Sequence, residues 1–155
     1  MKQNSTVKEQ SLNPQPAVRA TPQPVAEQLD ERVLAALHAA AEKKALEPVV
    51  LDLREIASFT DYFVIVSGAN ERQVQAISDE VYETLKKGGG HAAARVEGYK
   101  TAEWILLDYG DFVVHVFEQK ARKFYDLERL WRESKRVELP PEFSADSTSS
   151  LRRES

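Results

Sequence analysis

The spacing of hydrophobic and polar residues predicts three helices. Leu29, Val33 and Leu37 recur on one helical face, and the helix they form should end before Pro48. A second helix begins at the capping residue Asn70 and ends at a run of three glycines. Its apolar face comprises Val74, Ile77, Val81 and Leu85. A third helix carries a stripe that we assign to core packing: Ala121, Phe124, Leu127, Leu130 and Trp131.

Five short apolar segments between these helices predict strands. They are residues 49–53, 62–66, 93–97, 104–107 and 112–117. The last two flank the turn Asp108–Asp111, where Gly110 can adopt a positive φ, so they predict a hairpin. The order of helices and strands indicates an α/β fold, a mixed sheet of about five strands with flanking helices.

The two ends of the chain differ in composition from this patterned region. Residues 1–28 contain four of the seven prolines and few large apolar residues, which predicts a disordered N-terminal tail. Residues 135–155 include Pro140 and Pro141 followed by a polar stretch, and they predict a second disordered tail. The expected folded domain therefore spans residues 29–134.

Composition and charge narrow the classes of function. No apolar run approaches the roughly 20 residues of a membrane-spanning helix, and the first residues lack a secretory signal, so we expect a cytoplasmic protein. The absence of cysteine excludes disulfides and thiol chemistry. The net charge is -4, and residues 29–134 alone sum to -5. An acidic domain suits a basic protein partner better than primary binding to nucleic acid.

Catalytic patterns are incomplete. Ser67–Gly68 lies between a strand and a helix, where backbone N–H groups can hold an anion. Asp108 and Asp111 are three residues apart across a turn and so do not form the strand-paired carboxylates of a nucleotidyltransferase. The three histidines, His38, His91 and His115, lack metal-ligand spacing, so we predict no metal and no cofactor. Periodicity places His115 in the supporting sheet.

An ordered set of segments spans roughly residues 29–132. It comprises Thr60–Ile65, Ser67–Gly68, Asn70, Arg72–Val74, Val96–Gly98, the block WILLDYGDFVVHVF at Trp104–Phe117, and Phe124–Trp131. In order and spacing this set resembles the ribosomal silencing factor (Iojap) family.

This resemblance implies a fold like that of the nucleotidyltransferases but a role that is not enzymatic. It implies binding to the large ribosomal subunit at the ribosomal protein numbered fourteen. The bound factor would sterically block joining of the small subunit and so repress translation under nutrient limitation.

The expected partner-binding residues are Trp104, Asp108, Tyr109 and Asp111. Trp104 suits either core packing or an interface, and the resemblance favours an interface role shared with Tyr109. The two aspartates would meet basic groups of the partner. Two alternatives stay open: a nucleotide-binding or nucleotidyltransferase-like enzyme that uses Ser67–Gly68 with Asp108 or Asp111, and a homodimer that hides Trp104.

Overall fold

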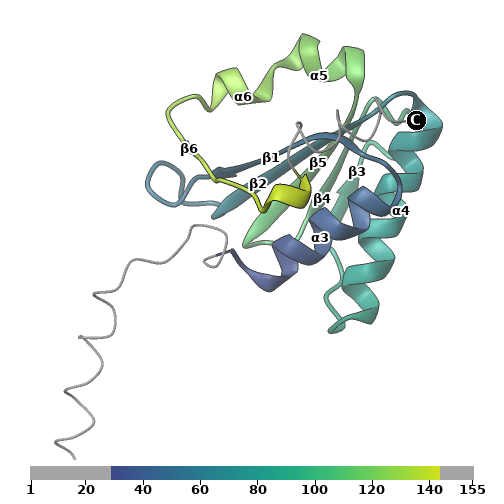
Figure 1. Cartoon of the computed structure of the whole chain (residues 1–155), viewed down its shortest axis with the longest axis horizontal. Helices are drawn as coiled ribbons and strands as arrows, with labels where there is room; N and C mark the ends of the chain where they lie inside the picture. The colour runs from purple at the N-terminus through teal and green to yellow at the C-terminus, as the bar shows by residue number, and fades with distance from the viewer. Residues whose placement is uncertain (1–28, 144–155) are drawn as a thin grey trace, which may run out of the picture.

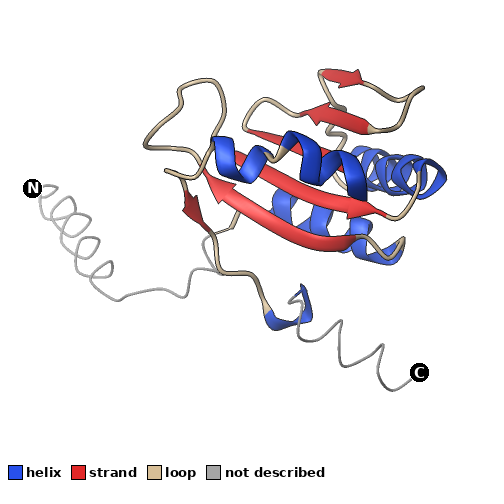
Figure 2. Cartoon of the chain, turned by 90° about the horizontal axis from the view of Figure 1, so that it is seen from above, coloured by secondary structure: helices blue, strands red, loops and turns tan. Residues whose placement is uncertain are grey.

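The computed structural model describes residues 29–143 and places helices on both faces of one mixed sheet (Figures 1 and 2). Its elements are α3 (Glu31–Glu42), β1 (Leu46–Asp52), β2 (Tyr62–Gly68), α4 (Glu71–Lys87), β3 (Arg95–Glu97), β4 (Trp104–Asp108), β5 (Phe112–Glu118), α5 (Gln119–Tyr125), α6 (Leu127–Leu130), β6 (Lys135–Arg136) and the 3-10 turn η2 (Pro141–Phe143). The predicted α/β class is confirmed. The predicted tails at 1–28 and 144–155 lie outside the described residues.

The sheet has the strand order β3-β4-β5-β2-β1-β6. Its central pair, β2 and β5, is parallel, with Tyr62 opposite Phe112, and the other pairs are antiparallel. The predicted hairpin is present as β4 and β5, and Gly110 in its turn has a φ of 87°. Strand β6 has only two residues and was not predicted.

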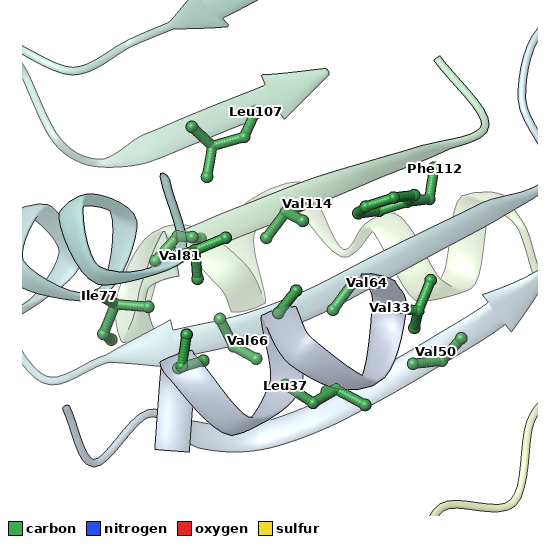
Figure 3. Packing of buried hydrophobic residues seen from close by; sticks show 14 of the residues in the cluster. Val33, Leu37, Val50, Val64, Val66, Ile77, Val81, Leu107, Phe112 and Val114 are labelled. Atoms are coloured by element: carbon green, nitrogen blue, oxygen red, sulfur yellow. The ribbon is translucent and has the colours of Figure 1, made fainter. Parts of the chain in front are cut away.

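The larger core lies between the sheet and helices α3 and α4. Alternate residues of the central strands, such as Val64 and Val114, point towards these two helices (Figure 3). The predicted apolar face of α4 is buried there, and so is Val33 from α3. The remaining alternate residues of β2 and β5, including Phe63 and Phe117, face the other side, under α5 and α6. Both central strands are therefore buried on two faces, as the continuous apolar run of residues 62–66 predicts for β2.

The predicted third helix is broken into two. Asp126 adopts a left-handed conformation with a φ of 48°, which ends α5 and starts α6 in a new direction. The rotation buries Leu127 but leaves Phe124 79% and Leu130 71% exposed. The assignment of these two residues to the core was therefore wrong, because their helical spacing is interrupted between them.

The folded part of the chain also continues past residue 134. Strand β6 pairs with β1, and the following segment packs against the core on the α3 side through Val137, Leu139 and Phe143. Phe143 is 5% exposed, and its ring lies 4.9 Å from that of His38. Residues 135–143, which we predicted to belong to the C-terminal tail, are thus part of the domain.

Candidate docking surface

Trp104, the first residue of β4, is half-buried on the sheet face covered by α5 and α6. Its ring lies 4.8 Å from the ring of Phe117 and 4.9 Å from that of Tyr125, centroid to centroid. Tyr125 itself is 46% exposed at the end of α5. Part of the Trp104 ring therefore packs on the sheet and part remains accessible, and its role in an interface stays a prediction.

A buried histidine fixes the orientation of this indole. The Nε1–H of Trp104 donates a hydrogen bond to Nδ1 of His115 at 3.0 Å. Burial lowers the pKa of His115 from 6.5 to about 3, so the ring is neutral at physiological pH. A neutral ring that accepts at Nδ1 carries its proton on Nε2. That nitrogen is buried and has no hydrogen-bond partner among residues 29–143. The prediction that His115 belongs to the supporting sheet agrees with this geometry, but the hydrogen-bonding capacity of its ring is only half used.

The side chains of Asp108 and Asp111 form hydrogen bonds in and around the turn after β4. Oδ1 of Asp108 accepts the backbone N–H of Gly110 at 2.9 Å, and Oδ2 accepts from Arg95 at 3.2 Å. Asp111 accepts from Nη2 of Arg32 at 2.8 Å while its side chain remains 66% exposed. Both carboxylates lie at the surface, and each already has a cationic partner within the chain.

Tyr109 lies on the opposite side of the sheet from Trp104. It packs against the core under α3 and α4, with its ring stacked on Phe112 at 5.0 Å. Its hydroxyl is buried without a partner among the described residues, and burial raises its pKa to about 12. The structure thus brings Trp104 and Asp108 onto one face, at the two ends of β4, and does not place Tyr109 beside them.

Sequence reasoning missed several exposed apolar side chains on this side of the sheet, of which Tyr125 contacts Trp104. Phe124, Tyr125 and Leu130 on α5 and α6 are exposed, and so is Phe59 in the β1–β2 loop, whose ring packs 5.9 Å from that of Trp131. The aspartate at 126 was the available signal, since Asp tolerates the left-handed conformation that breaks a helix. Periodicity alone takes no account of such a break.

The groups needed by the enzymatic alternative lie at different ends of the sheet. Ser67 is opposite Phe117, whereas Asp108 is opposite Val113, a separation of roughly 13 Å along the strands. The Ser67 hydroxyl is buried and accepts a hydrogen bond from Arg122 at 2.8 Å.

The N-terminus of α4 is also occupied by its own cap. Asn70 accepts the N–H of Gln73, and the side chain of Gln73 accepts the N–H of Ala69. Within residues 29–143, no group of three or more His, Asp or Glu side chains is placed to hold a metal ion. Nor is any helix in that range long and apolar enough to span a bilayer.

Comparison with known proteins gives consistent matches. A family model described as "Ribosomal silencing factor during starvation" matches residues 26–155. A ribosomal silencing factor from Halalkalibacterium halodurans is 42% identical over 104 residues, which cover 67% of this chain and 88% of that protein.

Two solved structures share the fold. A crystal structure of a Chromobacterium violaceum protein matches with a TM-score of 0.64 and 32% identity, covering 71% of this chain and 88% of that one. A crystal structure from Bacillus halodurans matches with a TM-score of 0.62 and 41% identity, covering 70% of this chain and 98% of that one.

Proposed function

The chain belongs to the ribosomal silencing factor family, and from this membership we propose that it represses translation by binding the large ribosomal subunit. The proposed contact is the ribosomal protein numbered fourteen, on the face that meets the small subunit. A factor bound there occupies space that the small subunit needs, so joining is blocked sterically. The proposed role requires no chemical step, and its setting is the cytoplasm under nutrient limitation.

The observation that carries this proposal is the indole of Trp104, which is partly exposed. Large aromatic side chains are frequent anchors of protein interfaces, and they bind best when their orientation is set beforehand. His115 and Tyr125 hold the ring from two sides, so little side-chain freedom is lost on docking. Because its N–H is used within the chain, Trp104 offers the partner apolar ring surface rather than a hydrogen-bond donor.

The turn after β4, at the other end of this strand from Trp104, adds acidic groups to the proposed surface. Asp108 and Asp111 can exchange their internal partners Arg95 and Arg32 for basic groups of a ribosomal protein. Such exposed charges mainly affect orientation and association rate. Tyr109 contributes through the turn, whose shape depends on its stacking against Phe112.

Binding to purified large subunits tests the proposal. Trp104→Ala should weaken binding about 30-fold, because truncating a central aromatic commonly costs about 2 kcal/mol. Asp111→Ala should have a smaller effect, concentrated in the association rate. Tyr99→Ala is the matched control, since Tyr99 is also a partly exposed aromatic but contacts Asp79 on α4. Wild-type protein should also slow subunit joining measured by light scattering, and Trp104→Ala should not.

Two results would count against this proposal. If wild-type protein never sediments with large subunits at low salt, the docking role is wrong. If Trp104→Ala and Tyr99→Ala bind equally well, the docking surface lies elsewhere.

A second copy of the chain is the competing occupant of the same surface. Tyr125 packs against Trp104 and Phe124 packs against Tyr125, and these exposed rings provide apolar area that a homodimer would cover. Light scattering gives the mass of wild type and of Trp104→Ala. If the wild-type mass is that of a monomer, or if the substitution leaves a dimer intact, the version in which Trp104 holds two copies together fails.

A further inference from the structure

The C-terminal part of the folded domain reverses the charge of the rest. Residues 29–118 contain sixteen Asp and Glu against nine Lys and Arg, whereas residues 119–136 contain three acidic and seven basic residues. The latter segment forms α5, α6 and β6, and we call it the α5–α6 arch (Figure 1). The moderate net charge of the chain therefore conceals a basic arch that lies over one face of an acidic body.

Most of the cations of the α5–α6 arch are exposed to solvent. Arg122 is buried in an ion pair with Glu128, and Lys135 is paired with Glu55. The other five make no ion pair with another described residue and are exposed: Lys120, Lys123, Arg129, Arg132 and Arg136. Because the charges are spread along the whole arch, they suit an extended anion better than a single carboxylate.

Apolar side chains are interleaved with these cations. Ala121 and Arg122 face inwards, so Lys120, Lys123 and Phe124 share the outer side of α5. Phe124 is 79% exposed, and its ring packs against that of Tyr125, 5.0 Å away. A ring that stands free between lysines offers its face for stacking, as aromatics do in sites for single-stranded nucleic acid.

Two adjoining cavities open at the foot of the α5–α6 arch. Their volumes are about 420 and 240 Å³, and Glu47, Arg122 and Lys123 line both. Lys120 lines the smaller cavity and Arg136 the larger. The guanidinium of Arg122 is fixed by hydrogen bonds to Ser67 and Glu128, at 2.8 and 2.7 Å. Cations outnumber carboxylates in the smaller cavity, whereas the larger one has three of each. The smaller cavity therefore favours an anion such as a phosphate group.

We propose that the α5–α6 arch binds the sugar–phosphate backbone of ribosomal RNA beside the docking surface. The inference rests on the proposed docking to the large subunit, since Tyr125 of the arch contacts Trp104 and the two surfaces are continuous. Phosphates reach Lys120, Lys123 and Arg129, and a base stacks on Phe124. The acidic residues 29–118 are repelled by RNA, whereas the basic α5–α6 arch is attracted. This difference in charge also sets the orientation of the bound domain.

RNA fits these observations better than an acidic protein or a lipid surface. An acidic protein patch would pair with the cations but would leave Phe124 without a stacking partner. A membrane would require a longer amphipathic helix than α5, which has seven residues, or α6, which has four. Binding to an acidic protein or to lipid vesicles would each contradict the proposal.

The test measures how binding of the full chain to purified large subunits depends on salt. The arch variant is Lys120→Gln/Lys123→Gln/Arg129→Gln, and the control variant Lys86→Gln/Lys87→Gln/Lys100→Gln removes the same charge from the α4 side. The slope of log affinity against log salt should fall by roughly 2 in the arch variant, at about 0.7–0.9 per lost phosphate contact. It should stay near the wild-type value in the control. Phe124→Ala should weaken binding roughly tenfold, and ultraviolet crosslinking should join the peptide containing Phe124 to RNA.

The possible failures are distinguishable. If wild type does not bind large subunits, the proposed docking fails. Binding to a single-stranded RNA 20-mer then tests the arch by itself. If the arch and control variants bind that RNA equally well, the inference is overturned. If wild type docks and both variants show the same salt slope, only the arch inference fails. It is equally overturned if Phe124 crosslinks to a protein, or if the chain binds phosphatidylglycerol vesicles but no RNA.

Discussion

Trp104 and His115 show how a single residue pair links the packing of the sheet to its surface. The indole needs an acceptor for its N–H, and Nδ1 of His115 supplies it at 3.0 Å. The remaining imidazole N–H is buried without a partner among residues 29–143, which costs about 1–3 kcal/mol of stability. A phenylalanine would avoid that cost but would leave the indole unanchored. The histidine therefore lowers the stability of the fold but fixes the orientation of the Trp104 ring.

His115→Phe should change the acid response of the protein more than its stability at neutral pH. The folded-state pKa of about 3 lies below the ordinary 6.5, so only the unfolded chain takes up a proton between these values. The contribution of His115 to the free energy of unfolding is fully present above pH 6.5. It falls by about 1.4 kcal/mol per pH unit as the pH drops towards 3. The variant should lack this loss, as measured by urea unfolding at pH 7 and pH 5.

His91→Gln is the control for this substitution. It removes a histidine from an exposed loop and keeps the buried one, so its free energy of unfolding should fall with acid as in wild type. If the free energy of unfolding of His115→Phe falls between pH 7 and pH 5 as much as that of wild type, the buried His115 does not cause the loss of stability in acid.

At the scale of elements, local periodicity predicted most of the helices and strands. It failed where a single residue or a partner distant in sequence determines where an element begins or ends. The strands 62–66 and 112–117 and the helix after Asn70 were correctly placed, because their apolar positions repeat within each segment. The break at Asp126 depends on one left-handed residue. Strand β6 depends on pairing with β1, about 84 residues earlier in the chain. Neither leaves a periodic signal.

The same distinction applies to the candidate site. Periodicity correctly placed His115 in the sheet, where its ring lies 6.3 Å from that of Phe117 on the same face of β5. It could not show that Trp104 donates to His115, because that depends on the register between two strands. Nor could it place Tyr109, since the turn directs this side chain to the opposite face from Trp104.

Helices α5 and α6 are fastened to the sheet by the buried side chain of Arg122, and Glu128→Gln should loosen them. Burial tends to raise the pKa of Glu128, but the hydrogen bond and charge of Arg122 outweigh it and lower the pKa below 4.5. The ion pair therefore stabilises the fold above pH 4.5, and this stabilisation is lost as the pH falls through the lowered pKa. At pH 7 the variant should lose about 2 kcal/mol, because an unpaired cation stays buried.

Hydrogen exchange locates the effect of Glu128→Gln. Amides of α5 and α6 should exchange faster than in wild type, while those of α4 stay protected. Glu133→Gln, at an exposed position beyond α6, is the control and should change stability little. Equal stability of wild type and Glu128→Gln across the pH range would show that Arg122 does not fasten these helices.

At the scale of the whole molecule, the end of the folded chain returns to close it. Strand β6 pairs with the end of β1, and the segment after it crosses to α3 (Figure 1). Phe143 is buried there. An uncovered strand edge can pair with other chains, so this closure also protects against aggregation. The folded domain thus depends on nine residues beyond the predicted boundary, from 135 to 143.

Phe143→Ala and Phe124→Ala make the same substitution at a buried and an exposed ring. The first should lower the free energy of unfolding by about 3 kcal/mol, since it removes a packed aromatic. The second should change it by less than about 0.5 kcal/mol. Chemical denaturation of both variants measures the difference. Similar losses would mean that the C-terminal segment does not close the core.

The parallel pairing of β2 with β5 has a consequence for how quickly the chain can fold. The hairpin of β4 and β5 joins neighbouring segments. In contrast, β5 pairs with β2 across the intervening chain of α4, β3 and β4, with Tyr62 opposite Phe112. Closing such a long loop consumes chain entropy before any contact compensates for it. The hairpin should therefore form early, and the rate of folding should be governed by the meeting of the two central strands.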